Sequence, residues 1–530
     1  MPIAPTAALL ALALLGAGED EVGAHAALHG RFTDRENTPD PTVLYDRAAR
    51  TFDLAPYLRT TGSDQYPSTL VSAGLDGRHG ALRWALMLDT GELRSQQFPR
   101  TSAVCATSQT PTGIDVLARG DCDLTFSGAR LRRGQAPPTV ALPDTRLQPA
   151  QLTSNGRAFE DELSSTLLVR EAWAGAVFGR NDFAGVKVGR MRFTVADGFV
   201  YDDYGTGVEA SLDLGALGPS FDVGAAIFYP TRDFPRAAGI TSPMVALRAD
   251  WLPSLFGHVG LFLALYRDRE DSTAELFRGA LAEPSVVRLQ GTGVGTAAYQ
   301  KEARTLAQVL GAPLHSGGTL GWLGTSGSLG AGPLKLDWTG ALGGGTLTLA
   351  TQQQQVESRI HGQLAWARLR RGVLDDVELY GFFLFLSGDL PPTEKQRLGL
   401  PPRYGGFIGI SPYVTATNIF FQGGVAETFA SRQATAPGVN GRGVIAPGLG
   451  ATWEPARALA LDARAAWLAA DEQGPYGGSF YGTETDFQVA WSPWHGVTLV
   501  AEADALFGGD FFAGGAPITK VVVGFDLEAP

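Results

Sequence analysis

The sequence has no apolar run of about 18 residues, the length that a membrane-spanning helix needs. Its longest apolar run, residues 7–15, fits the hydrophobic region of a secretory signal, and Ala24-His25-Ala26 fits a small-x-small cleavage site. No Lys or Arg precedes this run, which departs from the usual signal pattern. We predict a signal peptide at residues 1–26 and a mature chain at residues 27–530, with a buried N-terminal segment as the alternative.

Cysteine is nearly absent, because only Cys105 and Cys122 are present in 530 residues. The segment between them is polar and rich in turn-forming residues, and no His lies close to either cysteine, which argues against a zinc site. In an exported chain, two cysteines that flank a loop predict one disulfide. Two free thiols are the alternative.

Charge is also scarce, at 18% of residues, and no charge block or Ser-rich linker divides the chain into domains. The net charge of −12 argues against nucleic acid as a partner. None of the seven histidines stands in a spacing that suggests pairing with a nucleophile. We therefore predict that the chain is not an enzyme and that it binds no metal and no cofactor.

What the chain does contain is a regular alternation of apolar and polar residues, in runs of about ten that end in Gly, Asp or Pro. In the last run, Val521, Val523 and Phe525 share one face, whereas Lys520 and Asp526 lie on the other. A period of two indicates a β-strand. A strand with one apolar face and one charged face suits a wall between lipid and water.

Such runs recur along the whole chain, for example at residues 358–370, 377–387, 405–421, 443–453 and 457–468. With weaker runs near 28–33 and 119–133, we count about sixteen to eighteen strands, an even number as single-chain membrane barrels require. Backbone groups in a bilayer must bond between strands and leave no edge. The predicted fold is all-β, a single transmembrane antiparallel β-barrel of the outer membrane with about 16–18 strands, most simply 18. A soluble propeller or β-helix would show a fixed repeat, which this chain lacks.

Two long segments interrupt the alternation, residues 95–160 and residues 268–318. The first carries both cysteines and is interpreted as an extracellular loop or a constriction. In the second, residues 297–310 have the periodicity of a short amphipathic helix, either folded into the pore or packed outside the barrel mouth. Tryptophans stand at the ends of predicted strands, where the aromatic girdles of membrane barrels belong: Trp251, Trp453, Trp491 and Trp494.

Two segments carry a more specific pattern. Residues 186–214 contain a predicted strand with Gly189-Arg190-Met191-Arg192, followed by an aspartate pair, and residues 481–512 form a hairpin that opens with Gly-Thr-Glu-x-Asp and ends in Phe-x-Gly. Both resemble the alginate-export family of outer-membrane barrels. The resemblance implies a monomeric barrel of about eighteen strands that passes polar solutes or a secreted polysaccharide. Exporters of anionic polymer in that family are expected to line the pore with arginines, whereas the predicted inward positions here are more acidic than basic.

Charged residues at predicted inward positions are the candidate pore lining. They are Lys187, Arg190, Arg192, Glu209, Asp213, Arg248, Asp250, Lys335, Asp337, Asp462, Arg464, Asp486, Glu502, Asp504 and Lys520. Arg190 and Arg192 share a face beside Asp202 and Asp203, and we interpret them as part of a ladder of cross-strand ion pairs. A charged constriction that orients the solute is the alternative interpretation.

We therefore expect an outer-membrane channel that passes polar solutes or a secreted polysaccharide by passive diffusion through a charged lumen. The segments 95–160 and 268–318 would gate it. Its partners would be outer-membrane lipid, the solute and periplasmic or envelope proteins. The alternative is a structural or adhesive barrel with a plugged lumen that serves an envelope machinery.

Overall fold

Almost all of the regular structure in the described part of the chain is β-strand. The computed structural model describes residues 20–39, 43–46, 51–53, 61–90, 93–95, 115–117, 147–149, 168–179, 183–217, 220–230, 242–254, 257–269, 273, 315–350, 355–390, 392, 395, 399–410, 414–421, 441–473, 478–512 and 517–529. Within these residues, no helix is long and apolar enough to cross a membrane.

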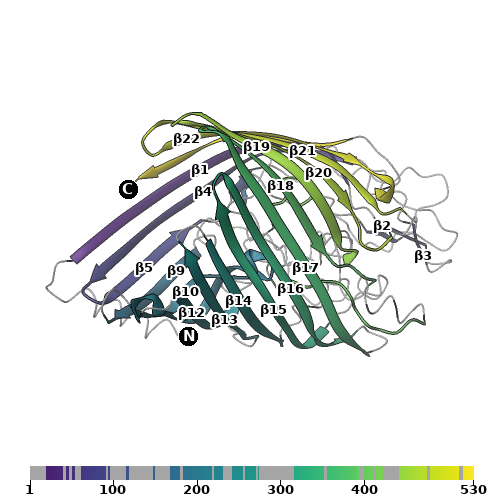
Figure 1. Cartoon of the computed structure of the whole chain (residues 1–530). Coiled ribbons are helices and arrows are strands. Elements are labelled where there is room, and N and C mark those ends of the chain that lie inside the picture. The colour runs from purple at the N-terminus through teal and green to yellow at the C-terminus, as the bar shows by residue number, and fades with distance from the viewer. Residues whose placement is uncertain are drawn as a thin grey trace.

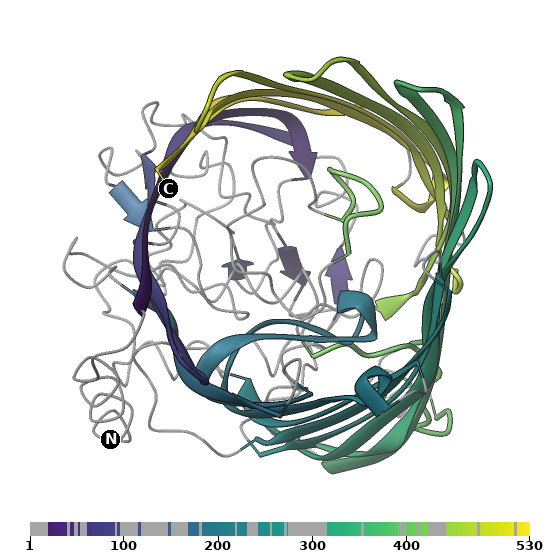
Figure 2. The ribbon, with the colours of Figure 1, turned by 60° about the vertical axis from the view of Figure 1, so that its left-hand side comes forward.

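Eighteen strands form one closed antiparallel ring (Figure 1, Figure 2). Strand β1 (Asp20–Pro39) pairs on one side with β4 (Thr61–His79) and on the other with β23 (Ile518–Ala529), so the first and last strands seal the ring. The others follow in chain order between β4 and β23: β5 (Leu82–Asp89), β9 (Leu168–Phe178), β10 (Ala184–Val195), β11 (Tyr201–Asp213), β12 (Phe221–Pro230), β13 (Met244–Ser254), β14 (Gly257–Asp268), β15 (His315–Ala331), β16 (Leu334–Ala350), β17 (Gln355–Leu374), β18 (Val377–Leu386), β19 (Val444–Ala456), β20 (Leu459–Ala469), β21 (Phe480–Trp494) and β22 (Val497–Gly508). The ring confirms the predicted all-β barrel and its predicted strand number.

Short strands lie outside the ring. β6 (Leu93–Ser95) and β8 (Leu147–Pro149) extend the sheet beside β4. A separate small sheet contains β2 (Val43–Asp46), β3 (Thr51–Asp53) and β7 (Asp115–Leu117). Neither group adds a member to the ring.

The ring strands have an apolar outer face, because successive side chains point to opposite sides of a strand. In β14, Leu261, Leu263 and Leu265 are 61%, 40% and 47% exposed, whereas Phe262 and Ala264 between them are buried. A large apolar surface is unfavourable in water but matches lipid. Since a closed ring also leaves no unpaired backbone edge, we assign the outer face to the hydrocarbon of a bilayer. The tryptophans near the ends of β13, β19 and β21 are exposed as well: Trp251, Trp453, Trp491 and Trp494.

The hairpin of β10 and β11 bends into the ring, where Figure 2 shows it crossing the interior. We call its tip, residues 190–205, the inturned hairpin. Phe193 stacks on Phe228 of β12 with ring centroids 4.1 Å apart, and Tyr201 packs on the same Phe228 ring at 5.0 Å. At the turn, Asp197 accepts a hydrogen bond of 2.5 Å from the hydroxyl of Thr339 on β16. One face of the inturned hairpin therefore lies flat against the inner wall.

The connection between β18 and β19 also enters the ring. We call its described residues 399–410 and 414–421 the inner strap. Trp322 of β15 donates to Ile408 O at 2.9 Å, and Ile410 N donates to Val200 O of the inturned hairpin at 2.8 Å. Tyr404 forms a bridge with Ile360 of β17. A buried apolar core therefore lies inside the ring, between the wall and the two segments that enter it.

Some predictions are corrected by this arrangement. The predicted strand at 405–421 is wrong over its described residues, which form the inner strap. The predicted disulfide between Cys105 and Cys122 and the predicted helix at 297–310 lie outside the described residues, as do most of the two long segments. Strand β1 begins at Asp20, so the predicted cut after Ala26, which stays a prediction, would remove residues 20–26 of that strand.

Candidate functional site on the inner wall

Charged side chains line the inner face of the ring. In β23, Lys520 is 3% exposed, whereas its neighbour Val521 on the outer face is 47% exposed. The same alternation places all but two of the predicted pore-lining residues on the inner face: Lys187, Glu209, Asp213, Arg248, Asp250, Lys335, Asp337, Asp462, Arg464, Asp486, Glu502, Asp504 and Lys520.

Arg190 and Arg192 are the two exceptions. They share a strand face with the outward Val186 and Val188, but they lie where the hairpin has already turned into the ring. Arg192 forms a two-bond ion pair with Asp202, Nε to Oδ1 and Nη2 to Oδ2, both 2.7 Å. This pair lies on the hairpin face opposite the one that covers the wall. It is a cross-strand ion pair inside the ring, whereas a role in orienting the solute stays a prediction.

Four carboxylates gather on the inner face of β21 and β22. Glu484 and Asp486 lie on β21, Glu502 and Asp504 lie on β22, and none is more than 4% exposed. Asp486 and Asp504 are directly opposite each other in the strand register. We call these four residues the acidic seat.

Two of the cationic side chains that the structure describes flank the acidic seat. Arg464 of β20 places Nε 3.0 Å from Asp486 Oδ2, on the neighbouring strand. Lys520 of β23 places Nζ 2.8 Å from Glu502 Oε1 and 3.8 Å from Asp504 Oδ2. Both cations therefore pair across strands, as expected for a ladder on one sheet face.

The inner strap lies on the acidic seat and bonds to it through uncharged groups. Glu484 accepts hydrogen bonds from Thr417 Oγ1 at 2.8 Å, from Ile419 N at 2.5 Å and from Phe420 N at 3.0 Å. Three donors on one buried carboxylate offset much of the cost of removing it from water. Glu484 is therefore the main attachment point of the strap.

Asn418 of the inner strap bridges the other members of the group. Its Nδ2 donates to Asp504 Oδ1 at 2.9 Å, and its backbone N donates to Asp486 Oδ2 at 3.3 Å. Its side-chain oxygen accepts from Arg464 Nη2, and its backbone oxygen accepts from Lys520 Nζ at 3.2 Å. This one neutral residue thus bonds to two acids and two bases of the wall.

The other end of the inner strap is anchored near β17 and β18. Asp389 accepts a hydrogen bond from Gly405 N at 2.7 Å and forms an ion pair with Lys395 Nζ at 2.5 Å. Tyr404 is fully buried and donates to Gly441 O at 3.3 Å. Burial, with a further contribution from Asp389, raises the pKa of Tyr404 well above its ordinary value, so its hydroxyl stays neutral.

A second group of charges, on β12 and β13, has no such cover. Asp222 is directly opposite Asp213 of β11 and Asp250 of β13 in the strand register. Among the described residues, the one cation that pairs with these acids is Arg248, which lies 3.9 Å from Asp250. We call these three acids and Arg248 the open patch. Asp222, Arg248 and Asp250 line a cavity of about 380 Å³, which the inturned hairpin closes on one side. The Arg248 side chain is 59% exposed and the Asp250 side chain 24%.

Smaller ion pairs continue the ladder elsewhere. Lys187 lies 3.8 Å from Glu209, and Arg370 of β17 lies 2.6 Å from Asp337 of β16. Lys335 stands opposite Arg370 in the register. Asp462 accepts hydrogen bonds from the hydroxyls of Tyr380 at 3.0 Å and Thr452 at 3.0 Å.

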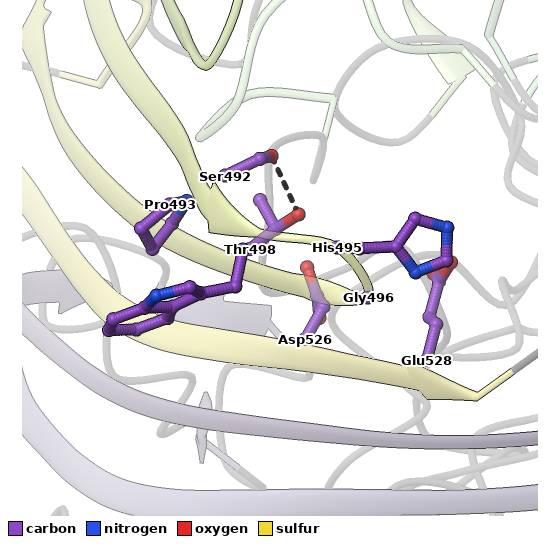
Figure 3. Close-up of a pocket in the computed structure, with 8 residues that line it drawn as sticks. Ser492, Pro493, His495, Gly496, Thr498, Asp526 and Glu528 are labelled. Carbon is purple, nitrogen blue, oxygen red and sulfur yellow. Dashed lines mark hydrogen bonds between the residues drawn. The ribbon is translucent and has the colours of Figure 1, made fainter.

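A hollow of about 310 Å³ lies at the turn between β21 and β22 (Figure 3). Ser492 and Thr498 are joined across it by a hydrogen bond of 2.9 Å, and His495 stands in the turn itself. Asp526, which also lines it, is already bonded to Arg31 at 2.7 Å and His29 at 2.6 Å. The hollow has the features of a turn at the rim of the barrel. In the part of the chain that the structure describes, no group of three or more His, Cys, Asp or Glu is arranged to hold a metal ion.

No protein-family model matches the chain, and no curated protein matches it. Among solved structures, it is similar to Pseudomonas aeruginosa OccK9 (OpdG), with 11% identity, a TM-score of 0.45 and coverage of 96% of this chain and 99% of the other. It is also similar to a BenF-like porin from Pseudomonas fluorescens Pf-5, with 10% identity, a TM-score of 0.46 and coverage of 96% and 99%. Pseudomonas aeruginosa OprD shares 9% identity at a TM-score of 0.44, with coverage of 96% and 95%. These likenesses are too distant to carry information on function, and they give no support to the alginate-export resemblance.

Proposed function

We propose that the chain is an outer-membrane channel that passes polar solutes by passive diffusion through a charged lumen. The observation that supports this most is the contrast between the two faces of the ring, charged within and apolar without. A ring of this many strands is too wide for its wall side chains to fill, so its interior is either water-filled or occupied by loops. Charges on the inner wall then set the field that a solute meets.

The inner segments narrow the passage to one side of the ring. The inner strap packs on β15, β17 and β20 to β23, and the inturned hairpin packs on β12 and β16. The open patch faces the cavity of about 380 Å³ beside the hairpin. A solute in that cavity would meet Asp222, Asp250 and Arg248. We therefore propose that charge, more than shape, sorts solutes there. A polyanionic polysaccharide is the cargo that this lining favours least.

A structural or adhesive barrel with a plugged lumen is the second candidate. The observation that favours it is the hydrogen bond from Ile410 N to Val200 O, which joins the two segments inside the ring. Two segments that bond to each other and to the wall would together form a permanent plug.

Current through planar lipid bilayers separates the two candidates. The purified barrel is inserted from detergent into a bilayer in potassium chloride, and its β-structure is checked by circular dichroism. Discrete current steps are expected for a channel. A folded barrel that inserts and carries no ion current would contradict the channel and support the plugged barrel.

Membrane insertion itself is tested at Leu342, an outward residue of β16 that is 63% exposed. Leu342→Arg places a charge on the lipid face and is expected to lower the free energy of unfolding in lipid by about 2–4 kcal/mol if the residue is near the bilayer centre. An unchanged stability would contradict the assignment of this face to lipid.

A further inference from the structure

Two exposed arginines lie on the outer face of the ring, at one edge of its apolar surface. They are Arg267 of β14 and Arg359 of β17. In the strand register, Thr319 of β15 and Thr346 of β16 stand between them, and both threonines are exposed as well. The four strands are neighbours in the ring (Figure 1). We call these four residues the outer row.

The outer row lies where the lipid-facing surface ends. On β14, Arg267 follows the outward Leu265, the last of the exposed leucines of that strand. On β17, a further outward arginine, Arg371, stands twelve residues from Arg359, opposite Leu334 in the register. Twelve residues of strand are about 40 Å long, or about 30 Å along the membrane normal at a usual tilt of about 40°. This matches the hydrocarbon thickness of a bilayer, so Arg359 and Arg371 lie at its two opposite surfaces.

The lengths of the connections show which surface carries the outer row. β14 and β15 are joined at this end by residues 269–314, and β18 and β19 by residues 387–443. At the opposite end the turns are short, for example residues 255–256 and 375–376. Membrane barrels have short periplasmic turns and longer extracellular loops. The outer row therefore faces the outer leaflet, and Arg371 faces the inner one.

The guanidinium groups of the outer row are available to a ligand. Neither Arg267 nor Arg359 forms a side-chain hydrogen bond or ion pair with a described group. A third exposed arginine, Arg403, stands beside Arg359, because Tyr404 N donates to Arg359 O at 2.9 Å. The acid on the same face of β17, Glu357, lies two residues from Arg359 and forms no ion pair with a described group.

This arrangement suits a phosphate group at the end of a lipid. Arginine forms two parallel hydrogen bonds with phosphate oxygens, and a threonine hydroxyl donates one more. The backbones of Arg267 and Arg359 are three strand spacings apart, about 14 Å, so a headgroup over the two threonines lies within reach of both long side chains. A phosphate held there can keep its acyl chains on the leucines of β14 to β16, whereas a free phosphate ion gains no such contact.

We propose that the outer row, together with Arg403, binds the phosphorylated headgroup of an outer-leaflet lipid whose acyl chains lie along β14 to β17. The outer leaflet of an outer membrane contains a phosphorylated glycolipid, which has the matching charge and position. The inference goes beyond the channel function, since the outer row lies outside the lumen. It depends on the contact of the outer face with lipid, which Leu342→Arg tests separately.

Binding of lipid A to the purified barrel in detergent micelles tests this inference. Lipid A has the acyl chains and the phosphorylated sugar headgroup of the outer-leaflet glycolipid. Titration followed by native mass spectrometry measures the affinity, and saturable binding is expected. Lipid A from which the phosphate has been removed is expected to bind about 10-fold more weakly or worse, because it loses the charge-assisted hydrogen bonds.

The double variant Arg267→Gln, Arg359→Gln removes both charges of the outer row and is expected to weaken lipid A binding by about 10-fold or more. Arg371→Gln is the matched control. It removes an exposed arginine from the same face of β17 at the opposite membrane surface, and it should bind lipid A as the unmodified protein does. Circular dichroism checks that each variant keeps its β-structure.

Three results would overturn the inference: equal affinity for lipid A with and without phosphate, unchanged affinity in the double variant, or an equal loss in Arg371→Gln. Displacement of lipid A by millimolar inorganic phosphate would also overturn it, because the arginines would then hold a free ion. Failure of the channel proposal looks different, since a barrel that carries no current would still bind lipid A through the outer row.

Discussion

The acidic seat and the open patch contain the same residue types at equivalent inward positions of neighbouring strands, yet they differ in what covers them. The seat is at most 4% exposed and lies under the inner strap, whereas Arg248 of the open patch is 59% exposed beside a cavity. A covered charge depends on its protein partners because water cannot replace them. An uncovered charge keeps water as a partner, so its ion pairs contribute little. The alternation of the strand decides which side chains face the interior. The segments that fold over a charged side chain decide how much its ion pair contributes to stability.

Lys520→Met should give the largest effect, because it removes a buried cation that pairs with the buried carboxylates of Glu502 and Asp504. We expect the free energy of unfolding to fall by about 3–5 kcal/mol. Urea unfolding in lipid vesicles, followed by tryptophan fluorescence, measures it. A loss below 1 kcal/mol would mean that water reaches the seat, and the contrast with the open patch would disappear.

Thr417→Val should have an intermediate effect. It removes the hydroxyl that donates to Glu484 at 2.8 Å while keeping the size of the side chain, so one lone pair of a buried carboxylate loses its donor. The expected loss is about 1–3 kcal/mol in the same unfolding measurement. Faster hydrogen exchange of the neighbouring backbone amides of Ile419 and Phe420 should accompany it. Unchanged stability together with unchanged exchange would show that Glu484 does not hold the strap.

Arg248→Met is the matched change in the open patch. The ion pair with Asp250 is long, at 3.9 Å, and the arginine is largely exposed, so the expected loss is at most about 1 kcal/mol. The comparison with Lys520→Met is the direct test, since both replace a cation on the inner face by methionine. Equal losses would contradict the role that we give to the inner strap.

Asp222→Asn should give the smallest effect, with the opposite sign. Asp222 is directly opposite both Asp213 and Asp250, and like charges at paired positions destabilise a sheet. Removing the middle charge is expected to stabilise the barrel by about 0.2–1 kcal/mol at low salt, and less at high salt because screening weakens the repulsion. A loss of stability would indicate that the three acids hold a cation between them.

The strands and their inward faces could be predicted from the sequence because both depend on a local period of two. Asp486, Glu502 and Lys520 are on the inner face for the same reason that Val521 is on the outer face. The inner strap could not be recognised in this way. Residues 406–410 are buried one after another, because the segment lies between the inner wall and the inturned hairpin. A short apolar run of this kind is also typical of a fully buried strand, so the sequence alone does not distinguish the two.

The inturned hairpin has a signal of its own in the sequence. Along β10 the polarity of the two faces inverts, because Val186 and Val188 share a face with Arg192, whereas Lys187 shares one with Phe193. An inversion of this kind within one strand indicates that the strand leaves the lipid-facing wall. The partners of the hairpin, such as Phe228 and Thr339, come from strands far along the chain and cannot be derived from a local pattern.

The pairing of β1 with β23 has a consequence for biogenesis. These strands come from opposite ends of the described chain, so the seam between them is the longest-range contact of the barrel and cannot form before Ile518–Ala529 has been delivered. Until then, β1 and β22 each present an unpaired edge in a region without water. A copy cut short before β23 would keep both edges unpaired and would be prone to pair with the strands of neighbouring molecules.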